Sequence, residues 1–193
     1  IPAYELSYYA DTKAEINDPG NIGEGSVNLT PWGLGGGTAN TQASGKYSFS
    51  AQGGIASGAY STAILKGVAT GERALALGEA AGATGNNSVA IGYTATAEGE
   101  FSIAISPYSL AYAKGKGSIS FGGTANGDGS VSFSRGGIAN GDGSISFGGT
   151  ANGVSSVAIG DSSESYNQGE VALGYRNFST DNKIVDEPLP SHY

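Results

Sequence analysis

The stretch NSVAIGYTATAEGEFSIAIS, residues 87–106, contains the pattern that predicts the fold. It holds two pairs of large aliphatic residues, Val89 with Ile91 and Ile103 with Ile105, and one alanine separates the members of each pair. Alternate residues of a β-strand point to the same face, so each pair lies on one face of a short strand. The second pair begins fourteen residues after the first, which indicates a repeating unit of that length.

Similar pairs recur through most of the chain at intervals of about fourteen residues. A short β-branched or aromatic run followed by glycine is typical of a strand before a turn. Strands repeated at a fixed period predict a parallel stack of coils, so we expect an all-β protein, a β-roll or β-solenoid of about eleven coils. We also expect the paired residues to face the coil interior. The pairs are Trp32/Leu34, Tyr47/Phe49, Thr62/Ile64, Leu75/Leu77, Val89/Ile91, Ile103/Ile105, Ile119/Phe121, Val131/Phe133, Ile145/Phe147, Val157/Ile159 and Val171/Leu173.

The residue between the members of each pair is always glycine, alanine or serine. It points to the opposite side of the strand from the pair, so we expect it to face outward. Uniformly small side chains allow another backbone to approach closely, which predicts that this face packs flat against copies of the chain. The expected interface residues are Ser48, Ala63, Ala76, Ala90, Ala104, Ser120, Ser132, Ser146, Ala158 and Ala172.

Several of these strings resemble the head repeat of YadA-like trimeric autotransporter adhesins. The clearest is NSVAIG at 87–92, and the others are RALALG at 73–78, FSIAIS at 101–106, SSVAIG at 155–160 and EVALGY at 170–175. The resemblance covers roughly residues 32–178 and implies a left-handed parallel β-roll in a side-by-side homotrimer. It also implies an extracellular head on a bacterial surface stalk that binds matrix proteins, host cells or other heads. In the family, collagen binding is linked to the NSVAIG repeat, which here comprises Asn87, Ser88, Val89, Ala90, Ile91 and Gly92.

The chain departs from the family pattern in three places. Later coils read SISFGG and SVSFSR, so serine and phenylalanine replace the usual alanine and isoleucine. Residues 1–31 do not follow the period, and we expect a cap or a link to an upstream region there. Residues 179–193 have no heptad repeat and are expected to form an extended tail, without the neck and coiled coil of such adhesins.

The longest interval between pairs, from Ile103 to Ile119, contains a candidate ligand-binding loop. An insertion that carries aromatic and cationic side chains and projects from a regular rod is a reasonable contact point for a glycan or an acidic protein. The candidate residues are Tyr108, Tyr112, Lys114 and Lys116.

Composition argues against several other functions. The formal net charge is -8, which opposes binding to nucleic-acid phosphates, and no stretch approaches the ~20 apolar residues of a membrane-spanning helix. Cysteine is absent, which excludes disulfides and thiolate metal sites. The one histidine, His192, lies next to the end of the chain, and no GxxxxGK[ST] loop is present. The GDG strings around Asp128 and Asp142 lack the nine-residue period of calcium-binding repeats.

We therefore expect a non-enzymatic, extracellular protein without cofactor or metal, which serves as an adhesin head or spacer. Its expected partners are two further copies of itself and a host matrix protein or cell-surface glycan. Two alternatives remain open from the sequence. The repeats also suit a structural or receptor-binding segment of a phage tail fibre or tail-like particle, and open solenoid ends suit a subunit of an extracellular filament.

Overall fold

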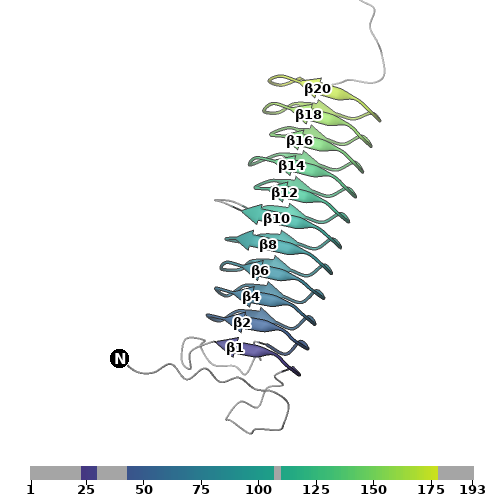
Figure 1. Cartoon of the computed structure of the whole chain (residues 1–193). Helices are drawn as coiled ribbons and strands as arrows, with labels where there is room; N and C mark the ends of the chain where they lie inside the picture. The colour runs from purple at the N-terminus through teal and green to yellow at the C-terminus, as the bar shows by residue number, and fades with distance from the viewer. Residues whose placement is uncertain (1–22, 30–42, 107–109, 178–193) are drawn as a thin grey trace, which may run out of the picture.

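The computed structural model describes residues 23–29, 43–106 and 110–177, which form a rod of stacked coils (Figure 1). The coils form two parallel sheets, which we name sheet A and sheet B; eleven described strands belong to sheet A and nine to sheet B. Sheet A contains β1 (Val27–Leu29), β2 (Phe49–Ala51), β4 (Thr62–Ile64), β6 (Leu75–Leu77), β8 (Val89–Gly92), β10 (Ile103–Ser106), β12 (Ile119–Phe121), β14 (Val131–Phe133), β16 (Ile145–Phe147), β18 (Val157–Ile159) and β20 (Val171–Leu173). Sheet B contains β3 (Ile55–Ala56), β5 (Val68–Ala69), β7 (Gly82–Ala83), β9 (Ala95–Ala97), β11 (Ala111–Ala113), β13 (Thr124–Ala125), β15 (Ile138–Ala139), β17 (Thr150–Ala151) and β19 (Glu164–Ser165).

Neighbouring coils pair in register, which confirms the predicted all-β parallel solenoid with coils of about fourteen residues. Ile103 of β10 pairs with Val89 of β8 on one side and with Ile119 of β12 on the other. Parallel strands place equivalent residues side by side, so the sequence period becomes the register of the sheet. Val131 in turn pairs with Ile119, although only twelve residues separate them. Differences in coil length are therefore absorbed in the turns and leave the strands in line.

Two kinds of turn connect the sheets. The A-to-B turn follows each strand of sheet A, and the B-to-A turn precedes each strand of sheet A. Every B-to-A turn contains one residue in the left-handed region, with φ between 53 and 69°. The residues are Gly25, Tyr47, Tyr60, Arg73, Asn87, Phe101, Gly117, Gly129, Gly143, Ser155 and Gly169. This conformation reverses the chain within a few residues and holds the two sheets close together.

The interior of the coils contains small side chains only, contrary to the prediction. Ala90 and Ala104 are fully buried between the sheets, and their equivalents from β2 to β20 are buried as well, whereas Asn28 of β1 is half-buried. The physical reason is the width of the coil: only Tyr93 and Thr94 separate β8 from β9, so the facing strands leave no room for larger groups. Our expectation that these residues face outward was therefore wrong. The predicted interface residues are all buried, at most 2% exposed, although Ser48 precedes β2 and Ser50 takes the interior place in that strand: Ser48, Ala63, Ala76, Ala90, Ala104, Ser120, Ser132, Ser146, Ala158 and Ala172.

The large paired residues correspondingly point outward from sheet A, where they are half-buried or exposed in the single chain. The pairing of β2 also corrects one pair. Phe49 aligns with Val27 and Thr62, so the outward pair of that coil is Phe49 with Ala51, and Tyr47 belongs to the preceding turn. Strand β1 shows that the stack begins within residues 1–31, whereas the predicted pair Trp32/Leu34 and the tail from residue 179 lie outside the described residues.

A column of glycines explains how closely the coils stack. At Gly85 an added Cβ would lie 2.1 Å from the carbonyl oxygen of Gly99, and at Gly99 it would lie 2.0 Å from that of Gly115. Real Cβ atoms do not approach a backbone oxygen so closely, so glycine is the residue that fits at this place. The column comprises Gly23, Gly45, Gly58, Gly71, Gly85, Gly99, Gly115, Gly127, Gly141 and Gly153.

Candidate binding surfaces

The outer side of sheet A forms a continuous apolar face along the rod. We define this apolar face by the first and third residue of each sheet A strand. None of these residues is charged, and Thr62 is the one polar member. Phe133 stacks between Phe121 and Phe147, with ring centroids 5.1 and 4.7 Å apart. At about 4.8 Å per strand, eleven strands make this face roughly 50 Å long.

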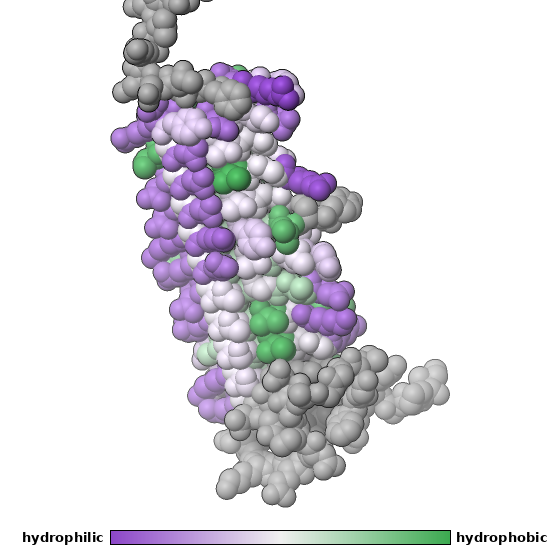
Figure 2. All heavy atoms as spheres, turned by 180° about the vertical axis from the view of Figure 1, so that it is seen from behind, coloured by the Kyte–Doolittle hydropathy of each residue, from purple (hydrophilic) through white to green (hydrophobic). Residues whose placement is uncertain are grey.

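The other side of the rod has a different character. Figure 2 shows it as a mostly pale surface with separate apolar spots, bordered by a hydrophilic edge. The outward residues of sheet B alternate between Thr, aliphatic, Gly, Tyr and Glu side chains, so no apolar column continues along it. Long uncharged apolar faces of this kind are typical of interaction surfaces.

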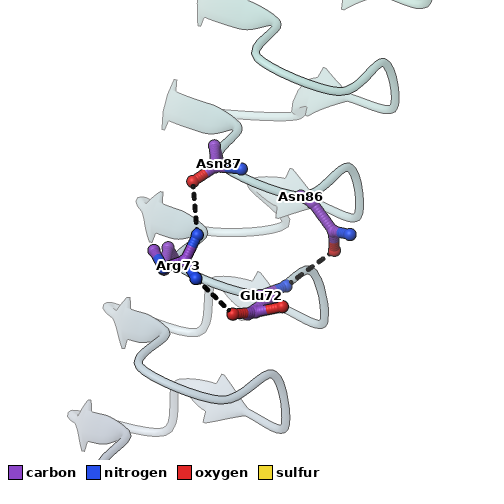
Figure 3. A network of polar contacts seen from close by, with 4 residues as sticks. All are labelled: Glu72, Arg73, Asn86 and Asn87. Carbon is purple, nitrogen blue, oxygen red and sulfur yellow. Dashed lines mark hydrogen bonds and ion pairs between the residues drawn. The ribbon is translucent and has the colours of Figure 1, made fainter.

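The first candidate ligand site, the hexapeptide at 87–92, divides between the interior and the surface. Ser88 and Ala90 are fully buried, while Val89 and Ile91 belong to the apolar face. Asn87 lies in the B-to-A turn, where its side-chain oxygen accepts a 3.4 Å hydrogen bond from the Arg73 guanidinium (Figure 3). The six residues therefore do not form one surface motif.

The contacts of Asn87 belong to a small polar ladder between adjacent coils. Arg73 also donates to the Glu72 carboxylate at 2.6 Å, and the backbone amide of Glu72 donates to the Asn86 side chain at 2.9 Å. Asn and Asp side chains form similar ladders in later coils, such as the 2.7 Å bonds that link Asn140 to Asn126 and Asn152. These groups stabilise the stacking of B-to-A turns, which gives Asn87 a structural role whether or not it contacts a ligand.

The second candidate site, around the long loop, also separates into parts. Tyr108 lies outside the described residues. Tyr112 points outward from β11, and the Lys114 ammonium lies 5.3 Å from the centroid of its ring. Lys116 lies in the opposite, B-to-A turn, where its Nζ is 2.9 Å from the Glu100 carboxylate. That hydrogen bond raises the pKa of the Lys116 ammonium above its usual value.

Part of the repeat matches a known family. The model of the YadA head domain repeat matches residues 69–93, 83–105 and 151–177. These segments are YadA head domain repeats. The YadA head repeat is a non-enzymatic structural module of bacterial surface adhesins, so the predictions of an adhesin-type β-roll and of a protein that is not an enzyme are confirmed. No curated protein matches the chain significantly.

The matched YadA repeats leave residues 106–150 between them, and this part carries a hollow that the sequence did not reveal. The hollow has a volume of about 540 Å³ and opens beside β11 at the A-to-B turns. Its lining residues are Leu110, Tyr112, Gly122, Gly123, Thr124, Arg135 and Gly136. Of the three predicted loop residues that the structure describes, Tyr112 lines the hollow, and Lys114 and Lys116 do not. The sequence contains one signal that could have located the hollow: the interval between pairs is sixteen residues from Ile103 to Ile119 and then twelve from Ile119 to Val131.

The described residues offer neither a metal site nor a membrane-spanning helix. Within residues 23–29, 43–106 and 110–177, no group of three or more His, Cys, Asp or Glu side chains could hold a metal ion. No helix in the same ranges has the length and hydropathy needed to cross a bilayer.

Proposed function

We propose that the chain is the head of a trimeric adhesin on a bacterial surface, in which three copies pack their apolar faces together. The observation that carries this proposal is the uncharged face along all eleven strands of sheet A. Water-exposed strand faces normally carry polar and charged residues, whereas a face this long without a charge gains free energy when another apolar surface covers it. The number three comes from the YadA head repeat, in which the heads are trimeric.

This arrangement replaces the interface expected from the small residues. A partner was inferred from the wrong side of the strand, because Ala90 and its equivalents fill the coil interior. Val89 and Ile91 take their place at the interface in this proposal. In the proposed trimer, Asn87 is the residue of the hexapeptide at 87–92 whose side chain could still contact a ligand.

Sheet B and the turns would present the ligand-binding surface in such a head. Three identical chains with repeated coils offer many equivalent positions, so weak contacts with a host matrix protein or a cell-surface glycan add up through multivalency. Linking binding sites in this way strengthens overall binding by roughly 10²–10⁴ without any new contact.

Light scattering after size-exclusion chromatography tests the assembly. We expect the full chain to have the mass of three copies. The double variant Val89→Lys, Ile91→Lys places two charges in the apolar face and is expected to run as a monomer that keeps its β-type circular dichroism. The matched control is Thr96→Lys on the outer side of sheet B, which is expected to remain trimeric. A monomeric wild type, or a double variant that stays trimeric, would contradict the proposal.

A further inference from the structure

We propose that the hollow beside β11 binds an acidic saccharide, a sugar ring that carries a carboxylate. This inference rests on the proposed adhesin function, because it names a class of host ligand for that surface. The hollow lies where the spacing of the strands in the sequence changes. Four residues separate β10 from β11 in the sequence, whereas Gly122 and Gly123 alone connect β12 to β13, the neighbour of β11 in sheet B. The hollow is largely open to solvent, and its volume of about 540 Å³ would accommodate a small ligand.

The wall of the hollow carries an uncompensated positive charge. Four of the seven Lys and Arg residues that the structure describes form ion pairs with carboxylates: Lys46, Lys66, Arg73 and Lys116. Arg135, on the hollow, has neither an ion pair nor a ring contact among the described residues. Because the whole chain is acidic, with a formal net charge of -8, a free guanidinium in a concave site is a specific feature. Guanidinium binds carboxylate through two parallel hydrogen bonds.

One of the residues that line the hollow, Tyr112, is aromatic. Tyr112 pairs in register with Thr96 on one side and Thr124 on the other, so its ring rises above two smaller neighbours. Lys114 lies over the ring and adds a second cation that no carboxylate neutralises in the described residues. An aromatic face suits the apolar C–H face of a sugar ring, and the Thr124 hydroxyl is a hydrogen-bond partner for sugar hydroxyl groups.

The backbone around the hollow favours a compact ligand over a peptide. Strands β9, β11, β13 and β15 are consecutive neighbours in sheet B, so their backbone groups already bond to one another. A peptide therefore has no free strand edge to extend, which removes the main source of affinity in strand-type peptide recognition. A single charged sugar ring that contacts both Tyr112 and Arg135 loses less conformational entropy on binding than a flexible peptide does.

The test measures binding of defined oligosaccharides to the full chain by isothermal titration calorimetry and saturation-transfer NMR. The probes are 3′-sialyllactose, a hyaluronan tetrasaccharide, neutral lactose and an acidic hexapeptide. We expect at least one of the two carboxylated saccharides to bind, with lactose and the peptide at least tenfold weaker. Failure of both carboxylated probes, or equal binding of lactose or of the peptide, would overturn the proposal.

Variants connect the binding to these side chains. Arg135→Gln and Tyr112→Thr should each lower the affinity at least tenfold. Threonine is the residue chosen for Tyr112 because both strand neighbours, Thr96 and Thr124, are threonines. The matched control is Arg176→Gln, an arginine outside the hollow without an ion pair among the described residues, which should leave binding unchanged. An affinity that is unaffected by Arg135→Gln would contradict the assignment. Light scattering on the same samples separates the outcomes, because a trimer that binds no saccharide overturns this inference and leaves the assembly intact.

Discussion

Replacement of one buried glycine should destabilise the rod far more than replacement of an exposed one. In Gly71→Ala, the new Cβ would lie 2.1 Å from the carbonyl oxygen of Gly85 and 2.6 Å from its carbon. An ordinary contact needs about 3.4 Å, so the two coils would have to separate by roughly 1.3 Å. The obstacle is backbone, which cannot rotate away as a side chain does. Overpacking of this kind costs about 3 kcal/mol or more, which lowers the melting temperature by roughly 6–12 °C.

Gly82→Ala is the matched control for this substitution. Gly82 lies in β7 on the outer side of sheet B, and an added Cβ there has nothing within 4 Å. Alanine in a strand loses less conformational entropy than glycine on folding, so this variant should be more stable by about 0.5–1 kcal/mol. Thermal unfolding followed by circular dichroism compares both variants with the wild type. Equal melting temperatures for Gly71→Ala and Gly82→Ala would refute the close stacking of the glycine column.

Two other substitutions test the interior of the coils. Ser102→Ala removes a buried hydroxyl that has no hydrogen-bond partner among the described residues, so stability should stay unchanged or rise by up to about 1 kcal/mol. Ser132→Ala removes a 2.8 Å hydrogen bond that the hydroxyl donates to the Gly137 carbonyl, so stability should fall by about 1 kcal/mol. Urea unfolding measures the stability of both variants. If Ser102→Ala were the less stable of the two, the hydrogen bonding assigned to these two hydroxyls would be wrong. Ala90→Leu should destabilise the chain by about 3 kcal/mol, while Ala90→Ser, which matches Ser120 two coils away, should cost less than about 1 kcal/mol. Similar melting curves for these two variants would mean that Ala90 does not lie between the sheets.

The parallel stack and its register could be predicted from the sequence alone. In a parallel sheet, equivalent residues of successive coils lie side by side, so the spacing of Val89, Ile103 and Ile119 directly determines their pairing. Irregular coils did not disturb this result, because the extra or missing residues fall in turns. Where the first coils depart from the pattern, the prediction was wrong: Tyr47 was taken as a strand residue, although its φ of 56° places it in a turn.

The tertiary structure alone decided which side of the strands is the inside. Alternation separates Val89 and Ile91 from Ala90 but does not say which face is covered by the same chain and which by another. Left-handed turn residues such as Asn87 bring the two sheets so close that alanine fills the gap, and the large residues are left on the outside. The hollow at Arg135 likewise depends on how successive coils stack, because its lining residues Tyr112, Thr124 and Arg135 come from neighbouring coils. Periodicity along a chain records local pairing, whereas the separation of the sheets and the shape of the surface depend on how each coil closes.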